Sequence, residues 1–179
     1  EVGAAVTMTA TEKSDLLRTH ARALTEAAVH LGSSQIRNRA TLGGNMVNAA
    51  QCADTVTAAC ALGASVVLMN ADGLLRELLL EDFIYGIGKT RLHPDEAMIR
   101  IKFPRPSYNV YSGFAKVGSR KTVTISKINL AMNFVFQDST IAKASICLGC
   151  VGPRTVRAEA KERFCAGKKW DLDLLEPLL

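Results

Sequence analysis

The stretch Gln35-Ile36-Arg37-Asn38-Arg39-Ala40-Thr41-Leu42-Gly43-Gly44-Asn45 is the most informative part of the chain. No clear period runs through residues 33–48, which predicts an ordered loop built around a glycine pair. Two adjacent residues without side chains allow positive φ and let a ligand approach the main chain closely. Their amide N–H groups can form an anion-binding nest suited to a pyrophosphate, with short polar groups at its rims. Taken alone, the glycine pair also fits a plain tight turn.

The segments on either side of this loop carry clearer periods. Alternating apolar residues predict a short strand over residues 2–8. Helical spacing predicts a helix over residues 20–31, with Gly32 placed as its C-cap. A second short helix is expected over residues 54–62, with Gly63 ending it. The loop is therefore expected to lie between two helices.

The residues that follow predict mainly β-structure. Two strand patterns, 65–69 and 74–80, flank an Asp72-Gly73 turn, which is a hairpin signal. Residues 83–94 are typical of a loop, and alternation over residues 97–103 predicts a further strand. The sequence up to residue 103 thus predicts a first lobe that mixes helices with strands.

A proline-rich step, Pro104-Arg105-Pro106, is the predicted lobe boundary. Beyond it, the pattern predicts three strands and then two helices, over residues 108–116, 125–136, 141–151, 157–164 and 172–179. The expected fold class is α+β, in which a second lobe packs an antiparallel sheet against C-terminal helices.

Composition limits the classes of function. The chain has 179 residues, of which 48% are hydrophobic and 22% are charged, so it is expected to bury a core. The net charge of +5 is modest and the basic residues are scattered. This pattern disfavours nucleic-acid binding and suits an anionic cofactor better. No apolar run is long enough for a membrane span, and no signal peptide is visible. Because the chain starts at Glu1, we expect an upstream segment to have been removed.

Five cysteines do not resemble a disulfide framework, and we therefore expect a cytoplasmic setting. Cys147 and Cys150 form a C-x-x-C spacing, which fits a redox pair or half of a metal site. The favoured interpretation is that both are small apolar residues packed in the strand-like run 144–151. No second pair completes a tetrahedral metal site, so no metal ligand is predicted, and no iron–sulfur pattern is found.

Several motifs, in order along the chain, resemble the FAD-binding subunits of molybdenum hydroxylases, the family of xanthine dehydrogenase and carbon monoxide dehydrogenase. The loop quoted above, followed by Asp54, resembles their second flavin-binding segment. Further matching stretches cover nearly the whole chain: Val2-Gly3-Ala4-Ala5-Val6-Thr7, Phe83, Gly86, Lys89-Thr90, Asp95-Glu96, Phe114-Ala115-Lys116-Val117-Gly118-Ser119-Arg120-Lys121, Ile125-Ser126, Asn129-Leu130-Ala131, Leu148-Gly149-Cys150-Val151-Gly152-Pro153 and Arg157-Ala158.

The resemblance implies a fold and a set of cofactor-binding residues. Residues 1–106 would be the second lobe of a two-lobed FAD-binding domain, and 107–179 a C-terminal domain that ends early. The family's N-terminal glycine-rich lobe, which supplies the other half of the pyrophosphate cradle, would be missing. The residues expected to bind FAD are Thr41, Leu42, Gly43, Gly44, Asn45, Asp54 and Lys127. The chain carries Ala50 and Gln51 where family members commonly have Ser-Pro.

The implied function is electron transfer, with no catalytic side chain in this subunit. A molybdopterin-binding large subunit would oxidise the substrate, and a small subunit with 2Fe-2S clusters would relay electrons. FAD would then pass them to NAD or another acceptor. One alternative is a non-catalytic module that docks partner subunits without flavin. Another is a flavin oxidoreductase that acts alone.

Overall fold

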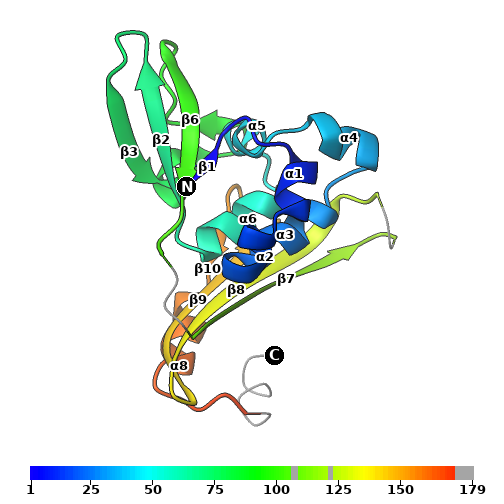
Figure 1. Cartoon of the computed structure of the whole chain (residues 1–179). Helices are drawn as coiled ribbons and strands as arrows, with labels where there is room; N and C mark the ends of the chain where they lie inside the picture. Colours follow the sequence, from blue (N-terminus) through cyan, green and yellow to red (C-terminus); the bar gives the residue numbers. More distant parts are fainter. Residues whose placement is uncertain (106–108, 121–122, 172–179) are drawn as a thin grey trace.

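A computed structural model describes residues 1–105, 109–120 and 123–171, and it contains two main antiparallel sheets (Figure 1). The first has the strand order β1-β6-β2-β3 and consists of β1 (Val2–Gly3), β2 (Ser65–Asn70), β3 (Leu75–Leu79) and β6 (Glu96–Lys102). The second has the order β10-β9-β8-β7 and consists of β7 (Val110–Gly118), β8 (Ser126–Gln137), β9 (Thr140–Gly149) and β10 (Val156–Arg157).

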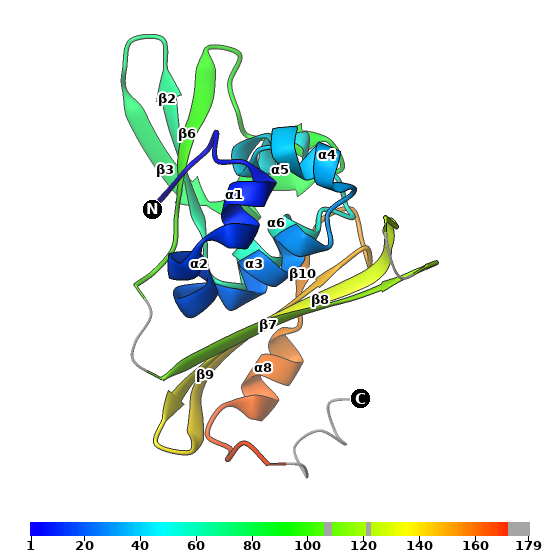
Figure 2. The ribbon, with the colours of Figure 1, turned by 45° about the vertical axis from the view of Figure 1, so that its right-hand side comes forward.

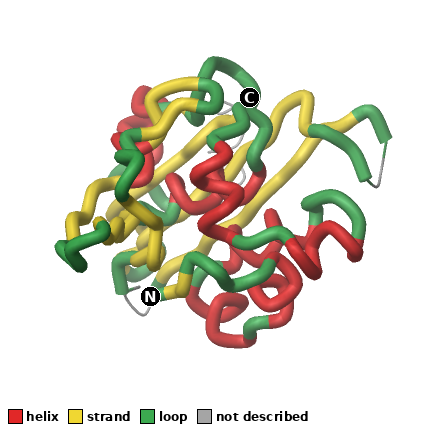
Figure 3. Tube along the Cα trace, turned by 90° about the horizontal axis from the view of Figure 1, so that it is seen from above, coloured by secondary structure: helices red, strands yellow, loops and turns green. Residues whose placement is uncertain are grey.

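Eight short helices and a small pair of strands accompany the two sheets in the described residues. Six precede β2: α1 (Met8–Lys13), α2 (Asp15–His20), α3 (Arg22–Val29), α4 (Ser34–Arg39), α5 (Leu42–Asn48) and α6 (Asp54–Ala61). Between β3 and β6 lie α7 (Leu80–Phe83) and a small pair of strands, β4 (Ile84–Gly86) and β5 (Lys89–Thr90), and the last helix is α8 (Glu159–Cys165). Figures 2 and 3 show the first helices gathered against the long strands of the second sheet, with α8 on the opposite side of that sheet in Figure 2.

Helix α6 is the centre of the core. All eight of its residues are buried, and small side chains let it pack closely against neighbours on every side. It contacts α3, β8 and β9, so it connects the first lobe to the second sheet. The main hydrophobic cluster accordingly includes Ala131 and Cys147 of that sheet. A second cluster around Phe134 and Ile141 lies under α8.

The α+β fold class is confirmed, and most elements with a clear period occur where they were predicted. The hairpin appears as β2 and β3, and the three strands of the second lobe appear as β7, β8 and β9. The two helices predicted for the first lobe, over residues 20–31 and 54–62, appear as α3 and α6, although His20 itself belongs to the preceding helix, α2. Gly32 and Gly63 both have positive φ, as helix terminators often do.

The prediction for the quoted loop was wrong, because residues 33–48 form two short helices. Ser33 and Thr41 each accept a hydrogen bond from the backbone N–H three residues later, and these N-caps start α4 and α5. The predicted strand over residues 2–8 was also too long. It stops at Gly3, because Thr7 caps α1 in the same way.

Two more segments differ from their predictions. Residues 83–94 contain β4 and β5 rather than a loop alone, and the helix expected from residue 157 begins at Glu159, because Arg157 pairs with Cys147 in the sheet. The helix predicted for residues 172–179 lies outside the described residues. None of the described helices is long and apolar enough to cross a membrane.

Candidate functional site

The first turn of α5 contains the glycine pair, and all of its N–H groups are already used. Thr41 is the N-cap, and its extended backbone brings the segment beside residues 4–7. Each of the next four N–H groups donates within the protein: Leu42 N to Val6 O at 2.9 Å, Gly43 N to Ala4 O at 2.9 Å, Gly44 N to Thr41 Oγ1 at 3.1 Å and Asn45 N to Thr41 O at 3.0 Å.

The predicted nest of amide donors is therefore wrong in its chemistry. These N–H groups hold the turn against the N-terminal segment and do not point at a ligand. Gly43 is buried for the same reason. A Cβ there would lie 2.6 Å from the Cβ of Ala4 and 2.9 Å from its carbonyl oxygen. The absence of a side chain at Gly43 thus serves packing.

The outer side of the turn offers a bare surface with two side-chain donors. Gly44 is exposed, while Thr41 and Asn45 are half-buried. Because Thr41 Oγ1 accepts from Gly44 N, its hydroxyl hydrogen is left to donate. Asn45 Oδ1 accepts from the Thr55 hydroxyl at 2.7 Å, which fixes the amide and leaves its NH₂ group without a partner among the described residues. Two side-chain donors at a helix N-terminus fit an anionic group.

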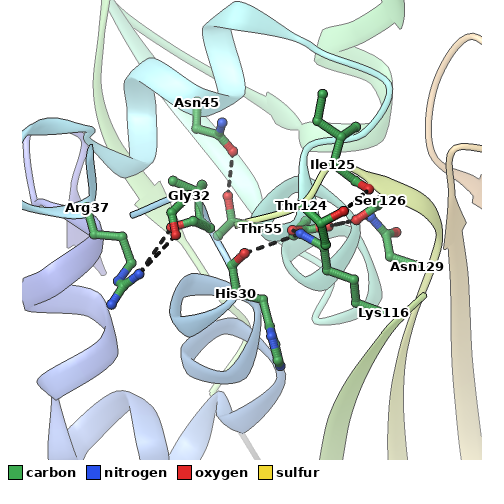
Figure 4. A network of polar contacts seen from close by, with 12 residues as sticks. His30, Gly32, Arg37, Asn45, Thr55, Lys116, Thr124, Ile125, Ser126 and Asn129 are labelled. Atoms are coloured by element: carbon green, nitrogen blue, oxygen red, sulfur yellow. Dashed lines mark hydrogen bonds and ion pairs between the residues drawn. The ribbon is translucent and has the colours of Figure 1, made fainter. Parts of the chain in front are cut away.

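The residues before the turn hold it in place. Arg37 forms an ion pair with Glu12 at 2.9 Å and donates to the carbonyl oxygen of Leu31. It also donates to the carbonyl oxygen of Gly32, as Figure 4 shows. Asn38 accepts a hydrogen bond from the Thr9 hydroxyl at 2.7 Å. Arg37 and Asn38 therefore anchor α4 to α1 and to the segment after α3, and only the C-terminal part of the quoted stretch forms the bare surface.

Asp54 lies at the start of α6 in a buried polar network, and Figure 4 labels its partners Lys116, Ser126 and Asn129. Its Oδ2 is 2.7 Å from the Nζ of Lys116 on β7, and both side chains are less than 10% exposed. Its Oδ1 accepts from the Ser126 hydroxyl and from the Asn129 amide, the latter at 2.8 Å. Lys116 also donates to the His30 carbonyl oxygen at 3.2 Å. The network thus connects α6 and the end of α3 to two strands of the second sheet.

This geometry changes the role that Asp54 can have. Both carboxylate oxygens are used within the protein and the side chain is buried, so Asp54 offers no free acceptor for direct contact with FAD in this conformation. Asp54 is connected to the turn only indirectly, because the adjacent Thr55 bonds Asn45. Sequence reasoning missed Lys116. The available signal in the sequence was a charged lysine within a predicted strand. Its partner, the Asp54 carboxylate at the start of α6, became apparent only in the folded structure.

The remaining predicted residues do not contribute to the bare surface. Leu42 is fully buried in the core cluster beneath the turn. Lys127 lies on β8 and is exposed, whereas its neighbour Ser126 is buried and faces Asp54. The side chain of Lys127 makes no hydrogen bond or ion pair with another residue of the described ranges. The structure therefore brings Thr41, Gly44 and Asn45 together in one helical turn, whereas Lys127 lies on a strand of the second sheet. No group of three or more potential metal ligands occurs among the described residues.

Comparison with known proteins identifies both parts of the chain. Residues 1–106 match the family described as the FAD binding domain in molybdopterin dehydrogenase. Residues 114–179 match the CO dehydrogenase flavoprotein C-terminal domain. The first match covers the α5 turn and Asp54, and the second covers Lys116 and the strands that complete the buried network.

Individual relatives agree with these families. The chain is 35% identical to the nicotinate dehydrogenase FAD-subunit of Eubacterium barkeri and 29% identical to the xanthine dehydrogenase FAD-binding subunit of Escherichia coli O157:H7. Each alignment covers 99% of this chain and 61% of the relative. The carbon monoxide dehydrogenase structure from Hydrogenophaga pseudoflava superposes with a TM-score of 0.88 at 26% identity, over 97% of this chain and 60% of that one. The chain thus spans about 60% of the length of these relatives. It belongs to the family of FAD-binding subunits of molybdenum hydroxylases.

Proposed function

We propose that the chain is part of an electron-transfer flavoprotein subunit that passes electrons from iron–sulfur clusters, through FAD, to NAD or another acceptor. The observation that carries the proposal is the bare outer surface of the α5 turn, which lies within the family's FAD-binding domain. FAD supplies the redox chemistry when it is bound, and the protein binds and orients it. Reduction and reoxidation of a flavin require no acid or base from this surface.

The residues of the turn would have different parts in holding FAD. The Thr41 hydroxyl and the Asn45 amide are the donors that suit the pyrophosphate, which carries two negative charges. Gly44 would let the cofactor lie against the main chain, since no side chain covers it. Buried Leu42 and Gly43 would act by fixing the shape of the turn. Asp54 would position the turn through Thr55 and Asn45, and Lys127 would face the flavin region only from the neighbouring domain.

The same proposal includes partners and a compartment. The partners would be a molybdopterin-binding large subunit and a small subunit with 2Fe-2S clusters, as the family assignment implies. The five cysteines are free, which fits the reducing cytoplasm. The domain boundary would lie near residue 106, between the two antiparallel sheets.

A second candidate function is an assembly module that docks partner subunits without flavin. One observation favours it. The end of the β7–β8 hairpin exposes apolar side chains, with Val117 at 59% and Ile125 at 75% exposure. Exposed apolar side chains that cluster at the end of a hairpin are typical of a surface covered by a partner.

Purification of the full-length subunit from its native host distinguishes these functions. We expect a visible flavin spectrum, co-purification of a molybdenum subunit and an iron–sulfur subunit, and bleaching of the flavin when the substrate of the complex is added. Partners without flavin would support the assembly module instead. Flavin turnover by the purified subunit without partners would support the stand-alone oxidoreductase.

A further inference from the structure

The two cysteines of the C-x-x-C spacing do not form a pair with each other in the folded chain. Cys147 lies within β9 and is fully buried in the core cluster, as predicted for a packing residue. Cys150 lies one residue beyond the end of β9 and is only half-buried. The two cysteines therefore differ in environment. The cysteine that lies near Cys150 is not Cys147 but one from a distant part of the sequence.

That neighbour is the segment just before α6. Cys150 N donates to Gln51 O at 3.1 Å, and Cys52 is the next residue after this carbonyl. Standard bond lengths then hold the Cα atoms of Cys52 and Cys150 within about 7 Å of each other. Disulfides usually join Cα atoms about 4.4–6.8 Å apart. Figures 1 and 2 show the loop after β9 running beside the α5–α6 segment.

The environment of the two thiols also indicates that they can react with each other. Both side chains are half-buried, so a small reagent can reach them. Burial raises the pKa of the Cys150 thiol, which disfavours its thiolate, and the next largest cause of this shift is Cys52, which therefore lies close to it. Cys150 also has a φ of +67°, a left-handed conformation that costs energy in any residue except glycine. Such a backbone outlier is a reason to look for a function at that residue.

We infer that Cys52 and Cys150 are a redox-active thiol pair that forms a disulfide between the FAD-binding domain and the C-terminal domain. The oxidant would be a low-molecular-weight disulfide. The Cys52 thiolate attacks one of its sulfur atoms and expels the first small thiolate, which gives a mixed disulfide. The Cys150 thiolate then attacks the Cys52 sulfur and expels the second. Two protein thiols are oxidised, the small disulfide is reduced to two thiols, and the two protons pass to the released thiolates.

A second pair of cysteines lies in the same two regions of the chain, at α6 and β9, but burial protects it from oxidation. Cys60 on α6 and Cys147 on β9 influence each other electrostatically, so they are also near neighbours. They are 6% and 0% exposed, respectively. Burial raises the pKa of Cys147 to about 12 and that of Cys60 further still. Since the thiolate is the nucleophile, these two residues are expected to stay reduced in the folded protein.

The two pairs can be separated by peptide mapping. The folded 179-residue chain is incubated with oxidised glutathione, blocked with an alkylating reagent and digested with trypsin. Cys52 and Cys60 both lie in the tryptic peptide 40–76, and Cys147 and Cys150 both lie in the peptide 144–154. We expect a disulfide-linked mass of these two peptides, lost on reduction. It should disappear in Cys52→Ser and Cys150→Ser and persist in Cys60→Ala and Cys147→Ala.

Other outcomes overturn the inference. A linked mass that survives Cys52→Ser, or that is lost in Cys60→Ala, would assign the bond to the buried pair. Mixed disulfides with glutathione at Cys52 and Cys150, without a link, would show that the two thiols do not meet. Circular dichroism confirms that each variant is folded. If Cys150→Ser does not fold, Cys150→Gly replaces it, because glycine accepts the left-handed backbone.

Discussion

The Nζ of Lys116 lies 2.7 Å from the Oδ2 of Asp54, and this buried contact joins residues 62 positions apart in the chain. It is the central link of the network between α6 and the second sheet. Two further donors, from Ser126 and Asn129, satisfy the other carboxylate oxygen. A buried ion pair of this kind is weak evidence for net stability. Removing only one of its two charges, however, strongly lowers the free energy of unfolding, because the other charge is left buried and unpaired.

Removal of one partner should therefore destabilise the protein strongly. We expect Lys116→Met to lower the free energy of unfolding by about 3–5 kcal/mol, because it leaves the Asp54 carboxylate buried without its counter-charge. The double variant Lys116→Met with Asp54→Asn should recover part of that loss. Urea unfolding of the wild type, both single variants and the double variant measures the coupling. Additive effects would contradict a direct interaction.

The sequence predicted those parts of the fold that local patterns determine. The hairpin of β2 and β3 follows from alternation around Asp72-Gly73, and the long strands of the second sheet follow from alternation alone. The two helices within residues 33–48 were missed because they are too short to show a hydrophobic period. Their start signals are the capping side chains of Ser33 and Thr41.

The site was harder to predict, because its chemistry depends on contacts distant in sequence. The glycine pair was singled out, but Gly43 N donates to the carbonyl of Ala4, and the neighbouring Leu42 N donates to that of Val6, both about forty residues earlier. Only the Gly44 donor has a local partner, the Thr41 hydroxyl, and nothing local could show that the Leu42 and Gly43 donors were already used. The position of Asp54 was likewise noticed, whereas its burial depends on Lys116 from the other lobe.

The two adjacent glycines should respond differently to substitution. We expect Gly43→Ala to destabilise the fold by about 1–3 kcal/mol, since its Cβ would collide with the main chain of Ala4. Gly44→Val in the full-length subunit should instead remove FAD while costing only about 1 kcal/mol, through disturbance of the Thr41 cap. The flavin-to-protein ratio and the thermal midpoint are measured together. Normal flavin content in Gly44→Val would exclude this turn from the cofactor site.

Acid should weaken the first sheet through Glu96. Its carboxylate accepts from Arg76 at 2.7 Å and from the His93 N–H at 2.8 Å, and chiefly the Arg76 guanidinium lowers its pKa to about 2. A depressed carboxyl pKa contributes stability above the unfolded value of about 4.5, and this contribution is lost as the pH falls toward 2. Urea midpoints across this range should fall less in Glu96→Gln than in the wild type. Glu159→Gln, which removes an exposed pair with Arg163, is the control and should leave the wild-type profile unchanged.

The last prediction concerns the 179-residue chain on its own, which should bind FAD only weakly. The donors of Thr41 and Asn45 and the bare surface of Gly44 lie on an open side of the turn, so solvent weakens each contact. Small-ligand sites usually enclose about 70–90% of their ligand, which a one-sided surface does not achieve. We expect a dissociation constant above about 10 µM, measured by quenching of flavin fluorescence, because little of the cofactor would be buried. A full-length FAD subunit titrated in parallel is the control. Stoichiometric nanomolar binding by the 179-residue chain would show that residues 1–179 enclose the cofactor by themselves. It would also show that residues outside the α5 turn contribute most of the contacts with FAD.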